Sequence, residues 1–354
     1  MTTLIARNVW RFYEGKPAVQ GLDLEVEEGS AYGFIGPNGA GKSTTLRILA
    51  TVDAPDAGRV WVKGWDTQQE PERVRKALGF MPDPFGMPEG FTVEQFLEFF
   101  AVAYRLTPVR RSSRVARAIE LTRIGERRKE KVTELSKGWK QRVLLAKTLI
   151  HDPDVLLLDE PAAGLDPAAR IEFREIIKAL RDMGKTILVS SHILTELADF
   201  CDSVGIIERG RMLVSGRIDD ILERLNPSDM LVFETFGEPG LAERVLAAQP
   251  DVTRVTFEKP NDKPGLVLVV AALQGRSDPQ RRAALLRTMV QAGVPVTGLR
   301  TRQEGLEDLF LKVAGKQGGG AAEVFSEDVM RKLLGGRASQ RYERDRDGGQ
   351  EGAE

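Results

Sequence analysis

The chain has 354 residues, 42% of them hydrophobic, and a formal net charge of -1. This length allows two domains and this composition allows a buried core, which excludes a chain that is disordered throughout. A charge so close to zero gives no sign of a general attraction to nucleic acid or to an anionic membrane surface.

The compartment follows from three further features of the sequence. No run reaches the roughly 18 apolar residues that cross a bilayer, and the first residues lack the basic-then-apolar layout of a secretory signal. The single cysteine, Cys201, excludes an internal disulfide and suits a reducing compartment. We therefore expect a cytoplasmic protein whose link to a membrane depends on another protein.

Short strands are expected at the amino end. Residues 4–9, 22–26 and 59–62 are apolar enough for strands, and turn residues around Gly15, Gly29 and Gly58 separate them. Residues 31–35 form a fourth short apolar run, which reads as a buried strand.

The most specific motif begins directly after that run and fits the pattern G-x-x-x-x-G-K-[ST]. A strand before it and a helix over residues 44–50 after it supply the context that a phosphate-binding loop requires. Glycines let successive N–H groups point at anionic oxygens, and the helix dipole adds positive potential there. The predicted ligands are ATP and Mg²⁺, and the predicted nucleotide-binding residues are Gly36, Pro37, Asn38, Gly39, Ala40, Gly41, Lys42, Ser43 and Thr44.

Within that loop, Lys42 would reach the β- and γ-phosphates, and the Ser43 hydroxyl would bind Mg²⁺. The alternative is a glycine-rich turn that fits the pattern by chance.

Residues 91–149 show a helical pattern. Val93, Phe96, Leu97 and Phe100 recur at spacings of three and four, which predicts one buried helix face. Aromatic residues on such a face belong to a core more often than to a binding site, and we interpret them in that way.

A second group of chemical residues follows the apolar run Val155–Leu158. Asp159 and Glu160 stand together at the carboxyl end of this predicted strand, where ligands of open α/β sheets bind. Neighbouring side chains on a strand point to opposite faces, so the two carboxylates need not share a role. Asp159 is placed to hold Mg²⁺ through a water, and Glu160 to polarise an attacking water. The alternative is a strand that runs into an acidic turn.

The chain changes character beyond about residue 220, and residues 226–229 read as a boundary. The expected order is a strand at 230–236, a helix at 241–248, strands at 253–258 and 266–271, a helix at 280–292 and a strand at 296–301. This βαββαβ order is that of a ferredoxin-like unit. A helix at 306–313 would close it.

We predict three parts: an ATPase domain at 1–225 with a helical subdomain at about 85–150, an α+β domain at 229–315, and a flexible tail at 316–354. Residues 323–334 of the tail fit one amphipathic helix, and residues 337–354 have the composition of a disordered segment.

Four motifs in sequence order resemble those of the ATP-binding cassette family, the nucleotide-binding subunits of ABC transporters. They are the phosphate loop, the segment Leu-Ser-Lys-Gly-Trp-Lys-Gln-Arg at 135–142, Ala-Gly-Leu-Asp at 163–166 after the carboxylates, and Ser-Ser-His at 190–192. The resemblance covers about residues 3–220. It implies a P-loop NTPase fold of the α/β class: a mostly parallel sheet, an antiparallel β part and a helical subdomain.

The resemblance also implies roles for single residues. Ser136 and Gly138 belong to the family's signature, which clamps the γ-phosphate held by the other subunit of a head-to-tail dimer. By its position Ser136 can also cap a helix that runs to about residue 150. Asp166 matches the D-loop, and His192 matches the switch histidine that contacts the γ-phosphate and helps hold Glu160.

Near the amino end, Tyr13 lies at about the spacing at which the family stacks an aromatic ring on adenine, with Phe12 as the alternative. The other histidine, His151, stands at a helix end and is interpreted as structural.

Two positions depart from the family's pattern. Asp83 stands where a glutamine that touches the metal and the membrane partner is usual, and it could still reach Mg²⁺ through water. Lys137 and Trp139 stand in the signature where glycine and glutamine are usual.

Together these features predict the ATPase subunit of an ABC exporter, which acts with a separate membrane permease and pairs with itself or with a related subunit. Residues 303–311 resemble the sequence that ends many exporter cassettes. The alternatives are an importer ATPase with a regulatory carboxyl-terminal domain, a non-transport cassette of translation or DNA repair, and a module that senses ATP without hydrolysing it. No nucleic-acid partner is expected.

Overall fold

The computed structural model describes residues 2–193, 197, 200–225, 229–237, 240–259, 265–275 and 277–302. The chain divides into two compact units, Met1–Ile218 and Asp219–Glu354. The predicted helices at 306–313 and 323–334, the tail at 316–354 and residues 226–228 of the predicted boundary lie outside the described residues.

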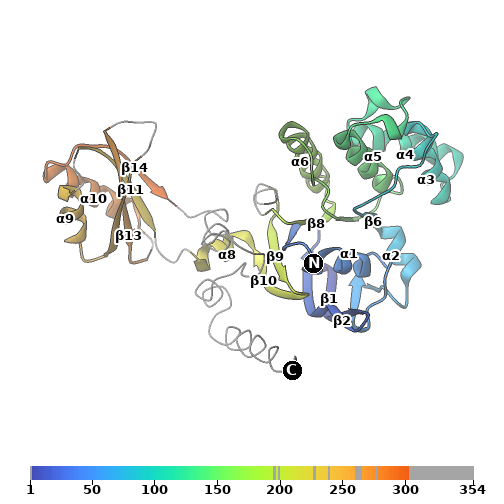
Figure 1. Ribbon diagram of the computed structural model, residues 1–354, viewed down its shortest axis with the longest axis horizontal. Helices are drawn as coiled ribbons and strands as arrows, with labels where there is room; N and C mark the ends of the chain where they lie inside the picture. The colour runs from blue at the N-terminus through green and yellow to red at the C-terminus, as the bar shows by residue number, and fades with distance from the viewer. Residues whose placement is uncertain are drawn as a thin grey trace. The chain divides into compact units, whose positions relative to one another are not determined.

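Unit 1 contains two sheets (Figure 1). The antiparallel sheet has the strand order β2-β1-β4-β5, formed by β1 (Thr2–Tyr13), β2 (Lys16–Glu27), β4 (Ala57–Val62) and β5 (Trp65–Asp66). The second sheet has the order β10-β9-β3-β8-β7-β6, formed by β3 (Ala31–Ile35), β6 (Leu78–Met81), β7 (Val155–Leu158), β8 (Thr186–Ser191), β9 (Ser203–Glu208) and β10 (Arg211–Arg217). Strands β9, β3, β8, β7 and β6 pair in parallel, and β10 pairs antiparallel to β9.

The strands β1 and β2 are longer than the sequence pattern suggests. They form one twisted hairpin with several register shifts, turning at Gly15. Such shifts break the strict alternation of apolar and polar residues that a sequence-based prediction follows.

The helices of unit 1 are α1 (Lys42–Leu49), α2 (Pro71–Ala77), α3 (Val93–Ala103), α4 (Pro108–Leu121), α5 (Lys137–Leu149), α6 (Pro167–Asp182) and, at the unit boundary, α8 (Ile218–Leu225). Two 3₁₀ turns, η1 (Gly125–Arg127) and η2 (Val132–Glu134), precede α5. In Figure 1, α3, α4 and α5 gather together as a helical group beside the sheets. Among the described residues, no helix is both long and apolar enough to span a membrane.

Helix α3 illustrates why the helical pattern holds. Thr92 and Gln95 form a capping box at its start, with the Thr92 hydroxyl accepting from the Gln95 amide. Val93, Phe96 and Leu97 are buried as predicted, whereas Phe100 is only half-buried.

Unit 2 has the order β11 (Met230–Phe236), α9 (Gly240–Ala247), β12 (Val252–Glu258), β13 (Leu266–Leu273), α10 (Pro279–Gln291) and β14 (Val296–Arg302). This is the βαββαβ order expected from the sequence. The strands form an antiparallel sheet in the order β12-β13-β11-β14, with α9 and α10 on one side of it (Figure 1).

Candidate functional site

The phosphate loop joins β3 to α1. Every residue of β3 is buried, so the strand holds the start of the loop firmly. Gly41 occupies the N-cap of α1 with φ of 103°, a left-handed conformation that glycine adopts readily. Within the described part of the chain, no side chain caps the first turn of α1, and that turn has no acidic residue. The amide groups there remain available for an anion.

Lys42 is almost fully buried in this loop, with 5% of its side chain exposed. Its Nζ donates to the carbonyl oxygens of Gly36 at 2.7 Å and Pro37 at 3.2 Å. It also lies 3.2 Å from Oε1 of Glu160. The ammonium group is therefore held over the loop and next to a carboxylate from a neighbouring strand.

Asp159 and Glu160 follow β7 directly and are linked by one hydroxyl. The Ser190 Oγ, at the end of β8, donates to Asp159 Oδ1 at 2.7 Å and accepts from the Glu160 backbone N at 2.9 Å. The sequence pattern alone predicts no separate role for Ser190. Its position at the end of the strand next to β7 is the only signal that could have indicated one.

Asp159 is 2% exposed. Burial raises the pKa of Asp159, hydrogen bonds with Ser190 and Ser43 oppose this rise, and the charges of Glu160 and Asp83 add to it. A nearby cation would remove this penalty on the charged carboxylate. The Asp159 carboxylate and the Ser43 hydroxyl are oxygen ligands of the kind Mg²⁺ prefers, so these residues fit a magnesium ion.

No cluster of three or more His, Cys, Asp or Glu that could hold a metal occurs in the described ranges. Because Mg²⁺ keeps several waters and shares its ligands with substrate phosphates, one carboxylate and one hydroxyl are enough for such a site. Asp83 is exposed after β6, and its charge reaches Asp159 without a direct contact.

Glu160 has φ of 44°, a left-handed backbone conformation unusual for a residue with a side chain. Its Oε2 lies 2.9 Å from Nδ1 of His192. Its Oε1 is buried and has no hydrogen bond to any described residue, although Lys42 Nζ is nearby. The ion pair with Lys42 therefore provides the opposite charge beside this buried oxygen.

The signature residues lie at the start of α5. Ser136 occupies the N-cap position and is exposed, but its hydroxyl makes no cap bond within the described residues, contrary to the expectation that it caps the helix. Gly138 lies close to α6, because a Cβ placed on it would stand 3.2 Å from Cβ of Ala169. Asp166 caps α6 by accepting from the Ala169 amide at 2.9 Å.

The two candidate adenine platforms point to opposite sides of β1. Tyr13 donates its hydroxyl to Asp53 at 2.9 Å, and Asp53 pairs with Arg47 of α1. Phe12 instead shares its side with Trp10, at a ring separation of 6.0 Å. Tyr13, and not Phe12, is therefore tied to the helix that follows the phosphate loop.

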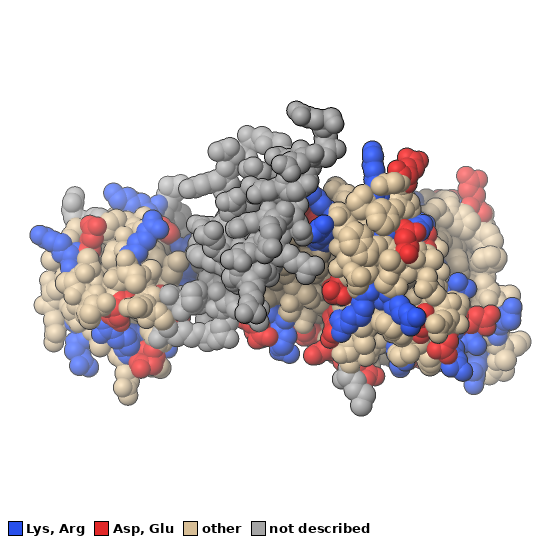
Figure 2. Space-filling view, turned by 90° about the horizontal axis from the view of Figure 1, so that it is seen from below, with Lys and Arg blue, Asp and Glu red and all other residues tan. Residues whose placement is uncertain are grey.

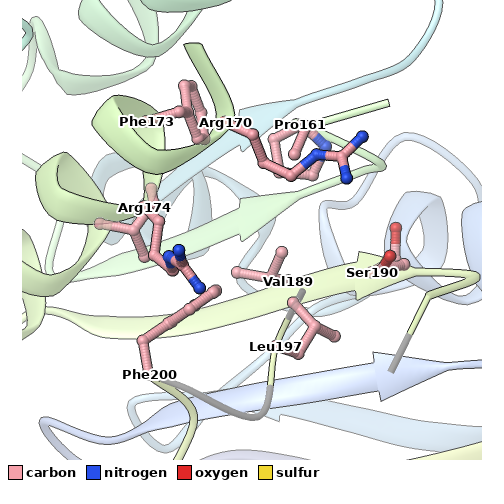
Figure 3. A pocket seen from close by; sticks show the side chains of 11 residues that line it. Pro161, Arg170, Phe173, Arg174, Val189, Ser190, Leu197 and Phe200 are labelled. Carbon is pink, nitrogen blue, oxygen red and sulfur yellow. The ribbon is translucent and has the colours of Figure 1, made fainter. Parts of the chain in front are cut away.

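A small cavity lies beside Ser190, at the end of β8, and is not lined by the phosphate loop (Figure 3). It is lined by Arg170 and Phe173 of α6, by Ser190 of β8, and by Pro161, Leu197 and Phe200. Its volume of about 30 Å³ suits a water and is far too small for a nucleotide.

A strand–loop–helix phosphate cradle, with two carboxylates at the end of a parallel strand, defines the class of P-loop ATPases. A family model described as "ABC transporter" matches residues 19–163. The chain is 34% identical to a Nod factor export ATP-binding protein I of Burkholderia orbicola, over 88% of this chain and 96% of that protein.

The chain is also 30% identical to the linearmycin resistance ATP-binding protein LnrL of Bacillus subtilis, over 88% of this chain and 98% of the relative. A solved structure of an ATP-binding subunit of an ABC transporter superimposes with a TM-score of 0.57 at 29% identity, covering 63% of this chain and 93% of that one. A dimeric bacterial ABC transporter cassette matches in fold with a TM-score of 0.55 at 24% identity, covering 60% and 98%. The chain belongs to the family of ABC transporter ATP-binding subunits, and its activity is ATP hydrolysis.

Proposed function

We propose that this protein hydrolyses ATP to power export through a separate membrane permease. The observation that carries the proposal is the position of Glu160, whose carboxylate lies between the Lys42 ammonium at 3.2 Å and the His192 imidazole at 2.9 Å. The direction of transport rests on the relatives, whose names describe export or drug resistance.

Each residue of the cluster has a distinct task in this proposal. Lys42 and the amides of the first turn of α1 bind the β- and γ-phosphates. Mg²⁺, held by Ser43 and through water by Asp159 and Asp83, would neutralise phosphate charge. Glu160 accepts the proton of the attacking water, and His192 orients the Glu160 carboxylate through Oε2.

The phosphate site described so far is built by one subunit, with Lys42 in the loop and Glu160 beside it. We propose that a second subunit closes it. The exposed Ser136 at the start of α5 is the group that would reach the γ-phosphate bound opposite, and Asp166 would lie at the same contact. Closure would exclude all water except the one next to Glu160.

The permease would dock on the helical group. Phe99 and Val102 of α3 and Tyr104 beyond it are 56%, 51% and 37% exposed, which is unusual for large apolar side chains. Asp83 is exposed on the connection between β6 and α3. Docking there would place the protein on the inner face of the cell membrane.

An importer ATPase stays the second candidate, because the cluster around Glu160 serves either direction. A nucleic-acid role has less support. In the face shown in Figure 2, basic and acidic side chains intermix over the described residues, with no broad basic surface of the kind that binds nucleic acid.

The test is Glu160→Gln, which preserves the shape of the side chain and removes the base. ATP hydrolysis should fall by about a hundredfold or more, while ATP should now stabilise a dimer visible by sedimentation. The isosteric control Glu120→Gln changes an exposed residue of α4 and should leave both properties unchanged. Wild-type turnover by Glu160→Gln would refute the assignment.

A further inference from the structure

The turn between β9 and β10 lies directly against the phosphate loop, although some 170 residues separate them in the sequence. The Gly210 amide donates to the Ala40 carbonyl at 2.8 Å, and the Gly210 carbonyl accepts from the Gln20 amide at 2.8 Å. One residue of this turn therefore bonds the phosphate loop on one side and β2 on the other.

The turn can approach the phosphate loop and β2 closely because glycine and backbone atoms form most of the contact. A Cβ built on Gly210 would stand 2.6 Å from the Ala18 carbonyl oxygen, and one built on Gly41 would stand 2.5 Å from the same oxygen. Gly36, at the other end of the loop, would meet the Ile207 carbonyl oxygen at 2.3 Å. Both ends of the phosphate loop thus lie against the backbone of neighbouring segments, namely β2, β9 and the turn after β9. These contacts leave no room for an added methyl group.

The side chain of Gln20 fixes the turn from β2. Its Nε2 donates to the Arg209 carbonyl at 2.7 Å, and its Oε1 accepts from Arg211 at 3.3 Å. Arg209 and Gly210 have φ of 47° and 78°, so the turn has two successive left-handed residues that these bonds hold in place.

We propose that Gly210 and Gln20 are positioning residues for nucleotide binding. They act through the phosphate loop, because the Ala40 carbonyl anchors the part of the loop that precedes Gly41 and Lys42. When the turn shifts, the loop amides and Lys42 no longer converge on the phosphates. The inference rests on the proposed function, since it concerns the same nucleotide.

The main experiment compares Gly210→Ala with Gly184→Ala. Gly184 also has a positive φ, 86°, but a Cβ there would meet nothing within 4 Å. The control therefore carries the backbone strain of alanine without the contact at the phosphate loop. We expect Gly210→Ala to raise KM for ATP and Kd for a non-hydrolysable ATP analogue about tenfold, with kcat within about twofold of wild type. Equal Kd values in the two variants would overturn the proposal.

A milder variant keeps the test valid if Gly210→Ala does not fold. Gln20→Met preserves size and neutrality but removes the side-chain hydrogen bonds to Arg209 and Arg211, and should raise the analogue's Kd about threefold. Gln68→Met, on an exposed residue, is its control. A lower melting temperature with an unchanged Kd would show a purely structural role and contradict the proposal. If wild-type protein binds nucleotide but does not hydrolyse it, the proposed function fails while this measurement of Kd still decides the positioning role.

Discussion

Two helices of unit 1, α1 and α5, both begin without a side-chain hydrogen bond to their first turn within the described residues, yet their surroundings differ. The first turn of α1 contains Lys42 and lies next to Glu160 and Asp159, so charges of both signs converge there. The first turn of α5 follows the exposed Ser136 at its N-cap and has no acidic residue. In the proposed dimer, the start of α1 belongs to the complete site of one subunit, and the start of α5 is a half site that the nucleotide of the other subunit completes.

Among the variants that test this comparison, Lys42→Ala should have the largest effect, which is a loss of ATP affinity. The change removes the buried ammonium from the complete site and should weaken ATP binding about a hundredfold, since hydrogen bonds to charged groups contribute roughly 1.5–3 kcal/mol each. Equilibrium titration with a fluorescent ATP analogue measures it. Lys63→Ala is the control, because Lys63 pairs with Asp154 in an exposed ion pair. A loss of less than threefold would contradict the assignment.

Ser136→Ala should give a smaller and different effect. The Ser136 hydroxyl makes no cap bond within the described residues, so the affinity of a single subunit for ATP should stay within about twofold. Dimerisation of the Glu160→Gln variant with ATP should weaken about tenfold, as expected for a lost hydrogen bond to a charged group. Sedimentation velocity measures it, with Ser113→Ala on exposed α4 as control. Unchanged dimerisation would mean that Ser136 does not contact the nucleotide bound by the other subunit.

A third effect, on stability and not on nucleotide binding, concerns the segment after the other end of α5. His151 stacks on Tyr104 at 4.0 Å and hydrogen-bonds the Leu78 carbonyl at 3.0 Å through Nε2. Burial, reinforced by Lys147, lowers the pKa of His151 to about 4. The unfolded chain takes up the proton near pH 6.5 and the folded chain near pH 4, so stability is lost as pH falls through this window.

Between pH 7.5 and 5 the free energy of unfolding should fall by about 2 kcal/mol from this residue. Urea denaturation at the two pH values measures the fall, and His151→Phe, which retains the stacking, should show a smaller one. Equal falls in both proteins would mean that His151 does not remain neutral in the fold.

Much of the site could be predicted from the sequence because its residues are local in the chain. The phosphate loop needs only a strand, three glycines and a helix in succession, and Asp159 and Glu160 need only to follow an apolar strand. These patterns depend on short-range backbone geometry, which nearby residues specify. The βαββαβ order of unit 2 was predictable for the same reason, since each element has its own apolar period.

Contacts between distant segments could not be predicted in this way. Ser190 reaches Asp159 only because β8 lies beside β7, and nothing in the spacing of the two residues indicates it. The same holds for the hydrogen bond between Gly210 and Ala40 and for the one between Tyr13 and Asp53, because the partners are far apart in the chain. The amino-acid sequence alone determined which chemical groups are present and their order. The packing of strands and turns decided which of them meet, because sheet order and backbone approach depend on the whole unit and not on neighbours in the chain.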